Sequence, residues 1–272
     1  MGAAFLIELT CYASIGTRLL SSWWQRLASV LAPYLLYSLA TGVFSWKGAA
    51  ILTLLGGAAS GWLRWLSPRW DAGFFALWGI AYLTKAVHEP YVGPMEGLRV
   101  DALAQLMWFR TCAHAVLTDR TSPGHDFAFL PGRRHWEIGF RYFACFAPIG
   151  LLLSLATGFA GFRLVPGFWW KAPATFFGIL WVVALGEEVL FRGLLQDLLA
   201  RRFGPWPAIA AVSVLFGAGH LWFGSRFPNW KFALLACAAS FFYGRAYLAA
   251  GSLRASMVAH ALTVTLWRTF LG

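Results

Sequence analysis

The stretch from 172 to 199 reads APATFFGILWVVALGEEVLFRGLLQDLL, so a long apolar run also holds two adjacent carboxylates and an arginine. About 20 mostly apolar residues suffice to cross a bilayer as a helix. A charged side chain at bilayer depth costs about 2.5–3.5 kcal/mol on insertion scales and usually marks a functional site. The stretch therefore predicts a membrane helix in which Glu187, Glu188 and Arg192 have a chemical purpose.

The composition of the whole chain agrees with a membrane protein. Of its 272 residues, 59% are hydrophobic and 12% are charged, whereas soluble domains are about 45–50% apolar and about 25% charged. The net charge of +11 comes from basic residues scattered between apolar runs, where such residues anchor helix ends and meet anionic headgroups. No separate basic domain is present, so we expect the bilayer and no nucleic acid as a partner.

The apolar runs predict an all-α, polytopic bundle of transmembrane helices with about eight spans. The candidate spans are 3–20, 27–46, 48–66, 72–87, 138–158, 172–199, 206–223, 230–250 and 253–271. The segment 100–117 is amphipathic, and we expect it to lie on the membrane surface.

One polar stretch, 118–137, contains several turn signals. We interpret it as a connecting loop within a single membrane domain, 1–272. It separates N-terminal helices in 1–137, which show no motif and no clustered charges, from a C-terminal core in 138–272 that holds the charged motif.

Helical geometry separates the two carboxylates of the motif. Glu188 and Arg192 stand four positions apart, so they share a helix face and can form an ion pair. Glu187 is rotated by about 100° from Glu188 and points elsewhere. A desolvated carboxylate without a cation holds a proton more readily, as a general base or acid near neutral pH requires. Pro173 suits the first turn of the helix.

Two histidines lie in later apolar segments of the same half, His220 after the small residues Gly217, Ala218 and Gly219, and His260 near the C-terminus. Small residues allow helices to approach closely. Glu187, His220 and His260 can then converge between three helices, where they could activate a water molecule or bind one metal ion.

These motifs resemble those of the CPBP family of intramembrane proteases, which includes the CaaX-prenyl endopeptidases and bacteriocin-immunity-like proteins. The family pattern is EExxxR, then FxxxH, then HxxxN or a relative. The chain has Glu187-Glu188-Val-Leu-Phe-Arg192, then Phe216-Gly-Ala-Gly-His220, then His260-Ala-Leu-Thr-Val264. The resemblance covers about 140–271.

The resemblance implies an intramembrane endopeptidase that cleaves a membrane-embedded or membrane-anchored polypeptide. Glu187 with His220 would activate the water, Glu188 and Arg192 would brace the site, and His260 would polarise the scissile carbonyl or stabilise the oxyanion. No cofactor is required by this scheme. If the enzyme were metal-dependent, Glu187, His220 and His260 would bind a divalent ion such as zinc.

The last motif departs from the family pattern, because Val264 stands where the family usually has asparagine. An amide there could donate to the oxyanion, a role often worth about 2.7–4 kcal/mol, and valine cannot. Thr263, on nearly the same face as His260, is the candidate to replace it.

Other functions remain open alternatives. A non-catalytic immunity or chaperone-like membrane protein would tolerate Val264. A proton-coupled transporter could also use buried Glu, Arg and His, although transporters usually have broken helices in repeated halves. A cysteine enzyme built on Cys112, His114 and Arg110 is disfavoured, because positions i and i+2 of a helix face apart. We expect a multi-pass protein of a bacterial plasma (inner) membrane, and the Arg-rich, Asn-poor composition suggests a GC-rich genome.

Overall fold

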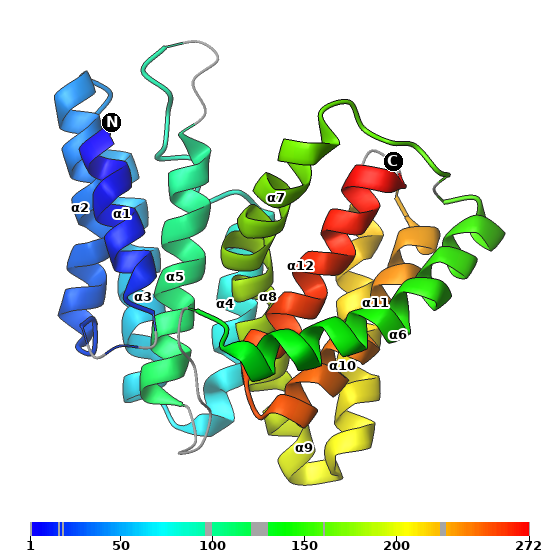
Figure 1. Ribbon diagram of the computed structural model, residues 1–272. Helices are drawn as coiled ribbons and strands as arrows, with labels where there is room; N and C mark the ends of the chain where they lie inside the picture. Colours follow the sequence, from blue (N-terminus) through cyan, green and yellow to red (C-terminus); the bar gives the residue numbers. More distant parts are fainter. Residues whose placement is uncertain are drawn as a thin grey trace. The chain divides into compact units, whose positions relative to one another are not determined.

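The protein is all-α, as the apolar runs predict, and Figure 1 shows its helices in a computed structural model. The structure describes residues 2–15, 17, 19–95, 100–120, 130–159, 161–223 and 227–271. The chain forms two compact units, Met1–Ser122 (unit 1) and Pro123–Gly272 (unit 2). Their boundary falls inside the polar stretch 118–137, of which 121–129 lie outside the described residues. The interpretation of 1–272 as one membrane domain stays a prediction.

The helices of unit 1 follow the predicted apolar runs. They are α1 Gly2–Ala13, α2 Trp23–Thr41, α3 Trp46–Trp65, η1 Pro68–Trp70, α4 Asp71–Leu83 and α5 Asp101–Asp119. Helix α2 begins where Ser22 and Gln25 form a capping box, which satisfies backbone N–H groups of the first turn. Helix α1 ends at Ala13, so the prediction of a first span over 3–20 is wrong in its C-terminal part.

The prediction that 100–117 lies on the membrane surface is wrong, because α5 is the buried helix of unit 1. It packs against α1, α2, α3 and α4, and residues on every side of it, such as Leu103, Trp108, Cys112 and His114, are buried. Its polar residues give it an amphipathic sequence, but Arg110, His114 and Asp119 are paired inside the unit.

A buried ion pair also corrects the expectation that the N-terminal half has no clustered charges. Arg110 Nε donates to Glu8 Oε1 over 2.7 Å, and Arg110 Nη2 donates to Glu8 Oε2 over 3.0 Å. Both side chains are fully buried. Arg26 pairs in the same unit with Asp119 at 2.6 Å. Glu8 and Arg110 stand 102 positions apart, so no local spacing could reveal the pair.

Unit 2 holds the motif-bearing segments. Its helices are α6 Arg133–Thr157, α7 Phe168–Gly178, η2 Ile179–Ala184, α8 Leu185–Leu190, η3 Phe191–Gln196, α9 Asp197–Phe203, α10 Pro205–Gly219, η4 His220–Trp222, α11 Trp230–Ala250 and α12 Leu253–Phe270. Helix α11 packs against α6, α10 and α12, and α6 crosses both α11 and α12 (Figure 1). A core of aromatic residues and alanines, including Phe146, Phe216 and Tyr243, joins these helices.

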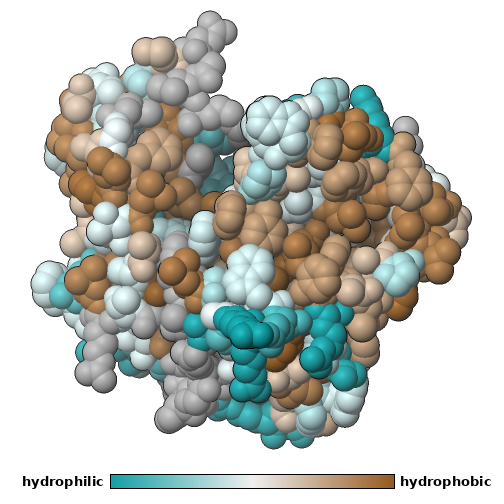
Figure 2. Space-filling model, viewed as in Figure 1, coloured by the Kyte–Doolittle hydropathy of each residue, from teal (hydrophilic) through white to brown (hydrophobic). Residues whose placement is uncertain are grey.

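Three helices among the described residues are long and apolar enough to cross a membrane. They are Arg133–Thr157, Phe168–Phe203 and Trp230–Ala250, all in unit 2. Large apolar side chains on these helices are exposed, among them Phe140, Leu152, Trp169 and Leu234. In Figure 2 the visible face of α6 and α12 is largely brown, and teal gathers where α6 begins. This surface suits a lipid environment, while the count of about eight spans stays a prediction.

Only one of the three small residues before His220 permits a close helix approach. A Cβ on Gly217 would lie 2.6 Å from the carbonyl oxygen of Ala233 and 2.8 Å from Cys237 Cβ, both on α11. A Cβ on Gly219 would meet nothing within 4 Å, and Ala218 is exposed. The predicted close approach of α10 is therefore made at Gly217.

Replacing Gly217 by alanine is expected to destabilise unit 2 by about 1–3 kcal/mol, because the new methyl group must push α10 away from the backbone of α11. Gly219→Ala is the matched control, and we expect its melting temperature to equal that of the unchanged protein. Thermal unfolding in detergent measures both. Equal melting temperatures for the two variants would show that α10 and α11 do not meet at Gly217.

Candidate functional site

The motif glutamates lie in the middle of one long helical segment, Phe168–Phe203. This segment begins four residues earlier than predicted, so Pro173 stands inside α7 and not in its first turn. Two π-helical stretches, η2 and η3, flank α8, which carries Glu187 and Glu188. π-Bulges occur frequently at functional sites, because they turn side chains away from their regular α-helical directions.

The predicted pairing of Glu188 with Arg192 is present. Arg192 Nη1 donates to Glu188 Oε1 over 3.1 Å, and both side chains are fully buried. Arg192 Nη2 also donates to the hydroxyl and the carbonyl oxygen of Ser240 on α11, over 2.6 and 2.9 Å. The guanidinium lies over the rings of Phe216 and Tyr243 as well. These contacts fix Arg192, and through it Glu188.

His260 on α12 lies next to both glutamates. Its Nδ1 is 2.8 Å from Glu188 Oε1, and its Nε2 is 3.8 Å from Glu187 Oε2. A carboxylate only accepts hydrogen bonds, so Nδ1 carries a hydrogen and donates a hydrogen bond to Glu188. Nε2 then faces Glu187 as the second nitrogen of an oriented ring.

Glu187 differs from its neighbour in the way that helical geometry predicts. Its side chain is 25% exposed, whereas that of Glu188 is fully buried. Its Oε2 is buried and accepts no hydrogen bond from the described residues. Glu187 therefore has an oxygen that a water molecule or a substrate could engage.

His220 does not pair with Glu187, although the sequence analysis expected the two to act together. Its Nδ1 is 2.7 Å from the carbonyl oxygen of Phe216, four residues earlier. A carbonyl oxygen accepts, so Nδ1 donates and Nε2 is left for other contacts. The ring packs against Phe216 and Phe232, with centroids 4.6 and 4.9 Å away. Among the described contacts, Glu187 is joined to His260 instead.

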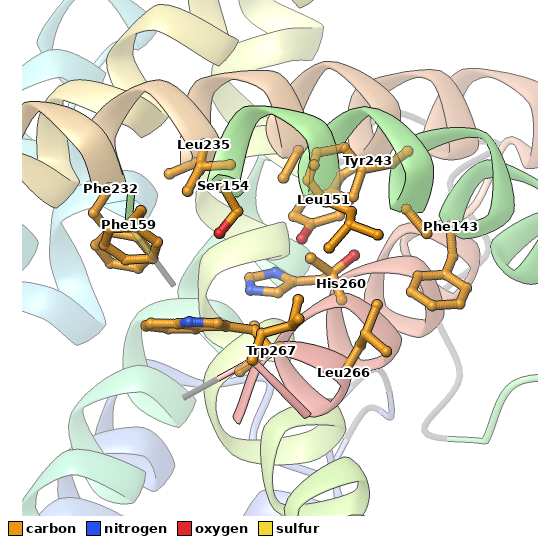
Figure 3. Close-up of a pocket in the computed structure, with 18 of the residues that line it drawn as sticks. Phe143, Leu151, Ser154, Phe159, Phe232, Leu235, Tyr243, His260, Leu266 and Trp267 are labelled. Atoms are coloured by element: carbon orange, nitrogen blue, oxygen red, sulfur yellow. The ribbon is translucent and has the colours of Figure 1, made fainter. Parts of the chain in front are cut away.

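Both histidines line one pocket of unit 2, with a volume of about 100 Å³. It lies between α6, α11 and α12, with the end of α10 and η4 beside them, and most of its wall is aromatic or aliphatic. Figure 3 shows His260 in the middle of this pocket, with Ser154 and Tyr243 on one side and Trp267 on the other. Glu187 does not line the pocket, so His260 connects the glutamates to it.

Thr263 and Val264 also line this pocket. The Thr263 hydroxyl donates to the carbonyl oxygen of Ala259 over 2.9 Å. Thr263 thus lies at the pocket wall, but its hydroxyl proton is donated within its own helix. Its role as that donor stays a prediction.

Two residues of the site were not found from the sequence. Ser240 fixes Arg192, and the Tyr243 ring stacks on His260 with centroids 4.7 Å apart and planes 13° apart. Both residues lie on α11, which carries none of the three motifs. Tyr243 and Ser240 are separated by three positions, a spacing that places two side chains on one helix face, but this signal is too common to single them out.

The residues predicted to bind a metal do not form a ligand set in the part of the chain that the structure describes. No three His, Cys, Asp or Glu side chains there gather closely enough to hold one ion. Glu187 and His260 are neighbours, while His220 is turned to the Phe216 carbonyl oxygen.

Comparison with known proteins supports the family resemblance. Residues 169–266 match the family model described as type II CAAX prenyl endopeptidase Rce1-like. The matched segment runs from α7 into α12 and contains Glu187, Glu188, Arg192, His220 and His260, whereas α6 and unit 1 lie outside it. No curated protein and no solved structure matches the chain.

Proposed function

Because residues 169–266 carry an Rce1-like domain of the CPBP protease family, we propose that the chain is an intramembrane endopeptidase that hydrolyses a peptide bond of a membrane-associated polypeptide. The observation that carries this proposal is the contact of His260 with both motif glutamates at the wall of an apolar pocket. An extended peptide segment with apolar side chains is the substrate that suits such a pocket.

The contacts suggest how the water is activated. Glu188, which is held by Arg192, accepts a hydrogen bond from the Nδ1–H of His260. This bond directs Nε2 of the ring toward Glu187. A water molecule that donates one hydrogen bond to Glu187 and one to Nε2 presents its oxygen lone pair to the substrate. This arrangement gives His260 the water-positioning role that the family resemblance assigns to His220.

Hydrolysis then proceeds by general acid–base catalysis. Glu187 takes a proton from the water as its oxygen bonds to the scissile carbonyl carbon, and the carbonyl electron pair moves to oxygen. When the C–N bond breaks, Glu187 returns the proton to the leaving amine. His220, whose Nε2 is left for other contacts, accepts a hydrogen bond from the substrate backbone and orients the scissile peptide.

Labelled water tests whether the chain hydrolyses a peptide bond. Membranes of the source organism, with and without this chain, are incubated in water that contains heavy oxygen, and their peptides are sequenced by mass spectrometry. We expect new C-termini that carry one heavy oxygen only where the chain is present. A chain that captures a membrane polypeptide without creating new termini would instead be the non-catalytic member of the family.

Chelation is expected to leave the activity unchanged, because Glu187, His220 and His260 do not gather as metal ligands in the described structure. The cleavage rate is measured after dialysis against EDTA and against phenanthroline, with a zinc protease treated in parallel as the positive control. A loss of cleavage that added zinc restores would contradict the metal-free mechanism.

A further inference from the structure

We propose that Ser154 supplies the hydrogen-bond donor for the carbonyl oxygen of the scissile peptide, so that its hydroxyl stabilises the oxyanion formed during hydrolysis. This inference rests on the proposed function and adds a residue to its site. Ser154 lies near the C-terminal end of α6, outside the segment that matches the family model.

The Ser154 hydroxyl is buried and has no partner in the part of the chain that the structure describes. The residue is 3% exposed, it lines the same pocket as His220 and His260, and its Oγ makes no hydrogen bond within the described residues. Buried polar groups in proteins are nearly always hydrogen-bonded, so an unpaired hydroxyl at a pocket wall points to a missing ligand. Figure 3 shows this oxygen directed toward the interior of the pocket.

Several hydroxyls of unit 2 are satisfied inside their own helices, and Thr265 Oγ1, which also has no partner among the described residues, does not line the pocket. A helical Ser or Thr can donate to the carbonyl oxygen four residues earlier. Thr157 does so to Leu153, Ser213 to Ile209, and Thr263 to Ala259, over 2.7, 2.7 and 2.9 Å. Ser154 does not make this bond, which leaves its proton for a group in the pocket.

Several other side chains of the described pocket wall are less suited to donate to an oxyanion. The Thr263 hydroxyl donates to the carbonyl oxygen of Ala259, and Val264 has no polar atom. His260 and His220 both use Nδ1 for partners within the protein. Ser154 therefore provides a buried hydroxyl donor that has no partner among the described residues, whereas Trp267, whose indole N–H is another donor of this wall, is only half-buried.

The backbone around Ser154 holds the hydroxyl in a defined place. Its carbonyl oxygen accepts hydrogen bonds from the N–H of Phe159 over 2.9 Å and from the cap residue Gly158. Gly158 adopts φ of 57°, a left-handed conformation that ends a helix and that glycine adopts without strain. A donor fixed before the reaction costs no reorganisation when negative charge develops.

The chemical step requires only a hydrogen bond from Ser154. When the water oxygen bonds to the carbonyl carbon, the electron pair of the C=O bond moves onto the oxygen, and the Ser154 O–H donates to it without losing its proton. Collapse of the tetrahedral intermediate returns that pair and expels the amine, which takes its proton from Glu187.

The test uses the peptide whose labelled C-terminus identifies it as the substrate, as a fluorogenic derivative in proteoliposomes. Ser154→Ala is expected to lower kcat by about 10²–10³-fold, as the loss of one oxyanion donor does elsewhere, with KM nearly unchanged. Adding Val264→Asn to that variant places a carboxamide on the same pocket wall, and we expect it to restore kcat at least 10-fold, on the order of one hydrogen bond.

Ser213→Ala is the matched control, because Ser213 is also a buried helical serine of unit 2 but does not line the pocket. We expect this variant to keep the kcat of the unchanged protein. Should Ser154→Ala fail to fold, Ser154→Cys keeps a side chain of similar size with a weak donor, and a loss of kcat is expected there too.

Three results would overturn the inference: an unchanged kcat in Ser154→Ala, a change confined to KM, or no recovery in the double variant. Each would leave the proposed function intact if Glu187→Gln is inactive toward the same peptide. Full activity of Glu187→Gln would instead overturn the proposed function itself.

Discussion

Replacing Glu187 by glutamine lowers kcat by about 10²–10⁴-fold, the usual contribution of a positioned general base. Glutamine has nearly the same shape as glutamate, but its amide cannot take the proton from water. Because Glu187 Oε2 has no hydrogen bond to lose and the side chain is 25% exposed, we expect the melting temperature to stay the same. Initial rates of peptide cleavage in proteoliposomes measure the effect.

Glu137→Gln is the control for this variant, since Glu137 is an exposed glutamate of α6 that pairs with Arg133. We expect it to cleave at the unchanged rate. His220→Ala should also be strongly impaired, through weaker positioning of the peptide. If Glu187→Ala and His220→Ala both kept full activity on the identified substrate, the proposed site would be wrong.

The second large effect concerns stability. Arg192→Met is expected to destabilise the protein by about 3–5 kcal/mol, because it leaves the Glu188 carboxylate buried without its cation. The variant also loses the hydrogen bonds of Arg192 to Ser240, which join the long helical segment to α11. Denaturation in mixed detergent, followed by circular dichroism, gives the free energy of unfolding.

A double variant separates the loss of the pair from the loss of the arginine alone. Glu188→Met combined with Arg192→Met removes both charges, and apolar replacement of a buried pair is often neutral. We expect it to recover most of the stability but none of the activity, since His260 then has no acceptor for Nδ1. Arg133→Met, at an arginine that is 93% exposed, is the control. Equal stability of Arg192→Met and Arg133→Met would contradict the role of the buried pair.

The spacing of residues along the sequence was sufficient to predict a contact where both partners belong to one helix. The pair of Glu188 and Arg192 follows from four positions of separation, and the different exposure of Glu187 follows from one. The apolar runs likewise predicted the helices of unit 2, because a helix satisfies its backbone within its own segment. The predicted start of α7 and the predicted end of α1 were wrong by a few residues, because the composition near these ends is compatible with more than one helix boundary.

Contacts between distant segments could not be predicted in this way. The Glu8–Arg110 pair joins residues 102 positions apart, and the contact of His260 with Glu188 joins residues 72 positions apart. The motifs predict both His260 and His220 near the glutamates, but only the packing of α12 against α8 decides which histidine contacts them. Ser154 was missed altogether, because a serine in an apolar run carries no motif.

The sequence by itself determined that the chain is helical and suited to a membrane, and that Glu188 pairs with Arg192. It also determined that two histidines of apolar segments lie in the same C-terminal half as this pair. These features depend on composition and on the helical repeat, which act over a few residues. Only the tertiary structure decided that His260 bridges the two glutamates, that His220 turns to the Phe216 carbonyl oxygen, and that Ser154 faces the pocket. The physical reason is that side chains from separate helices meet according to how those helices pack, which no single helix specifies.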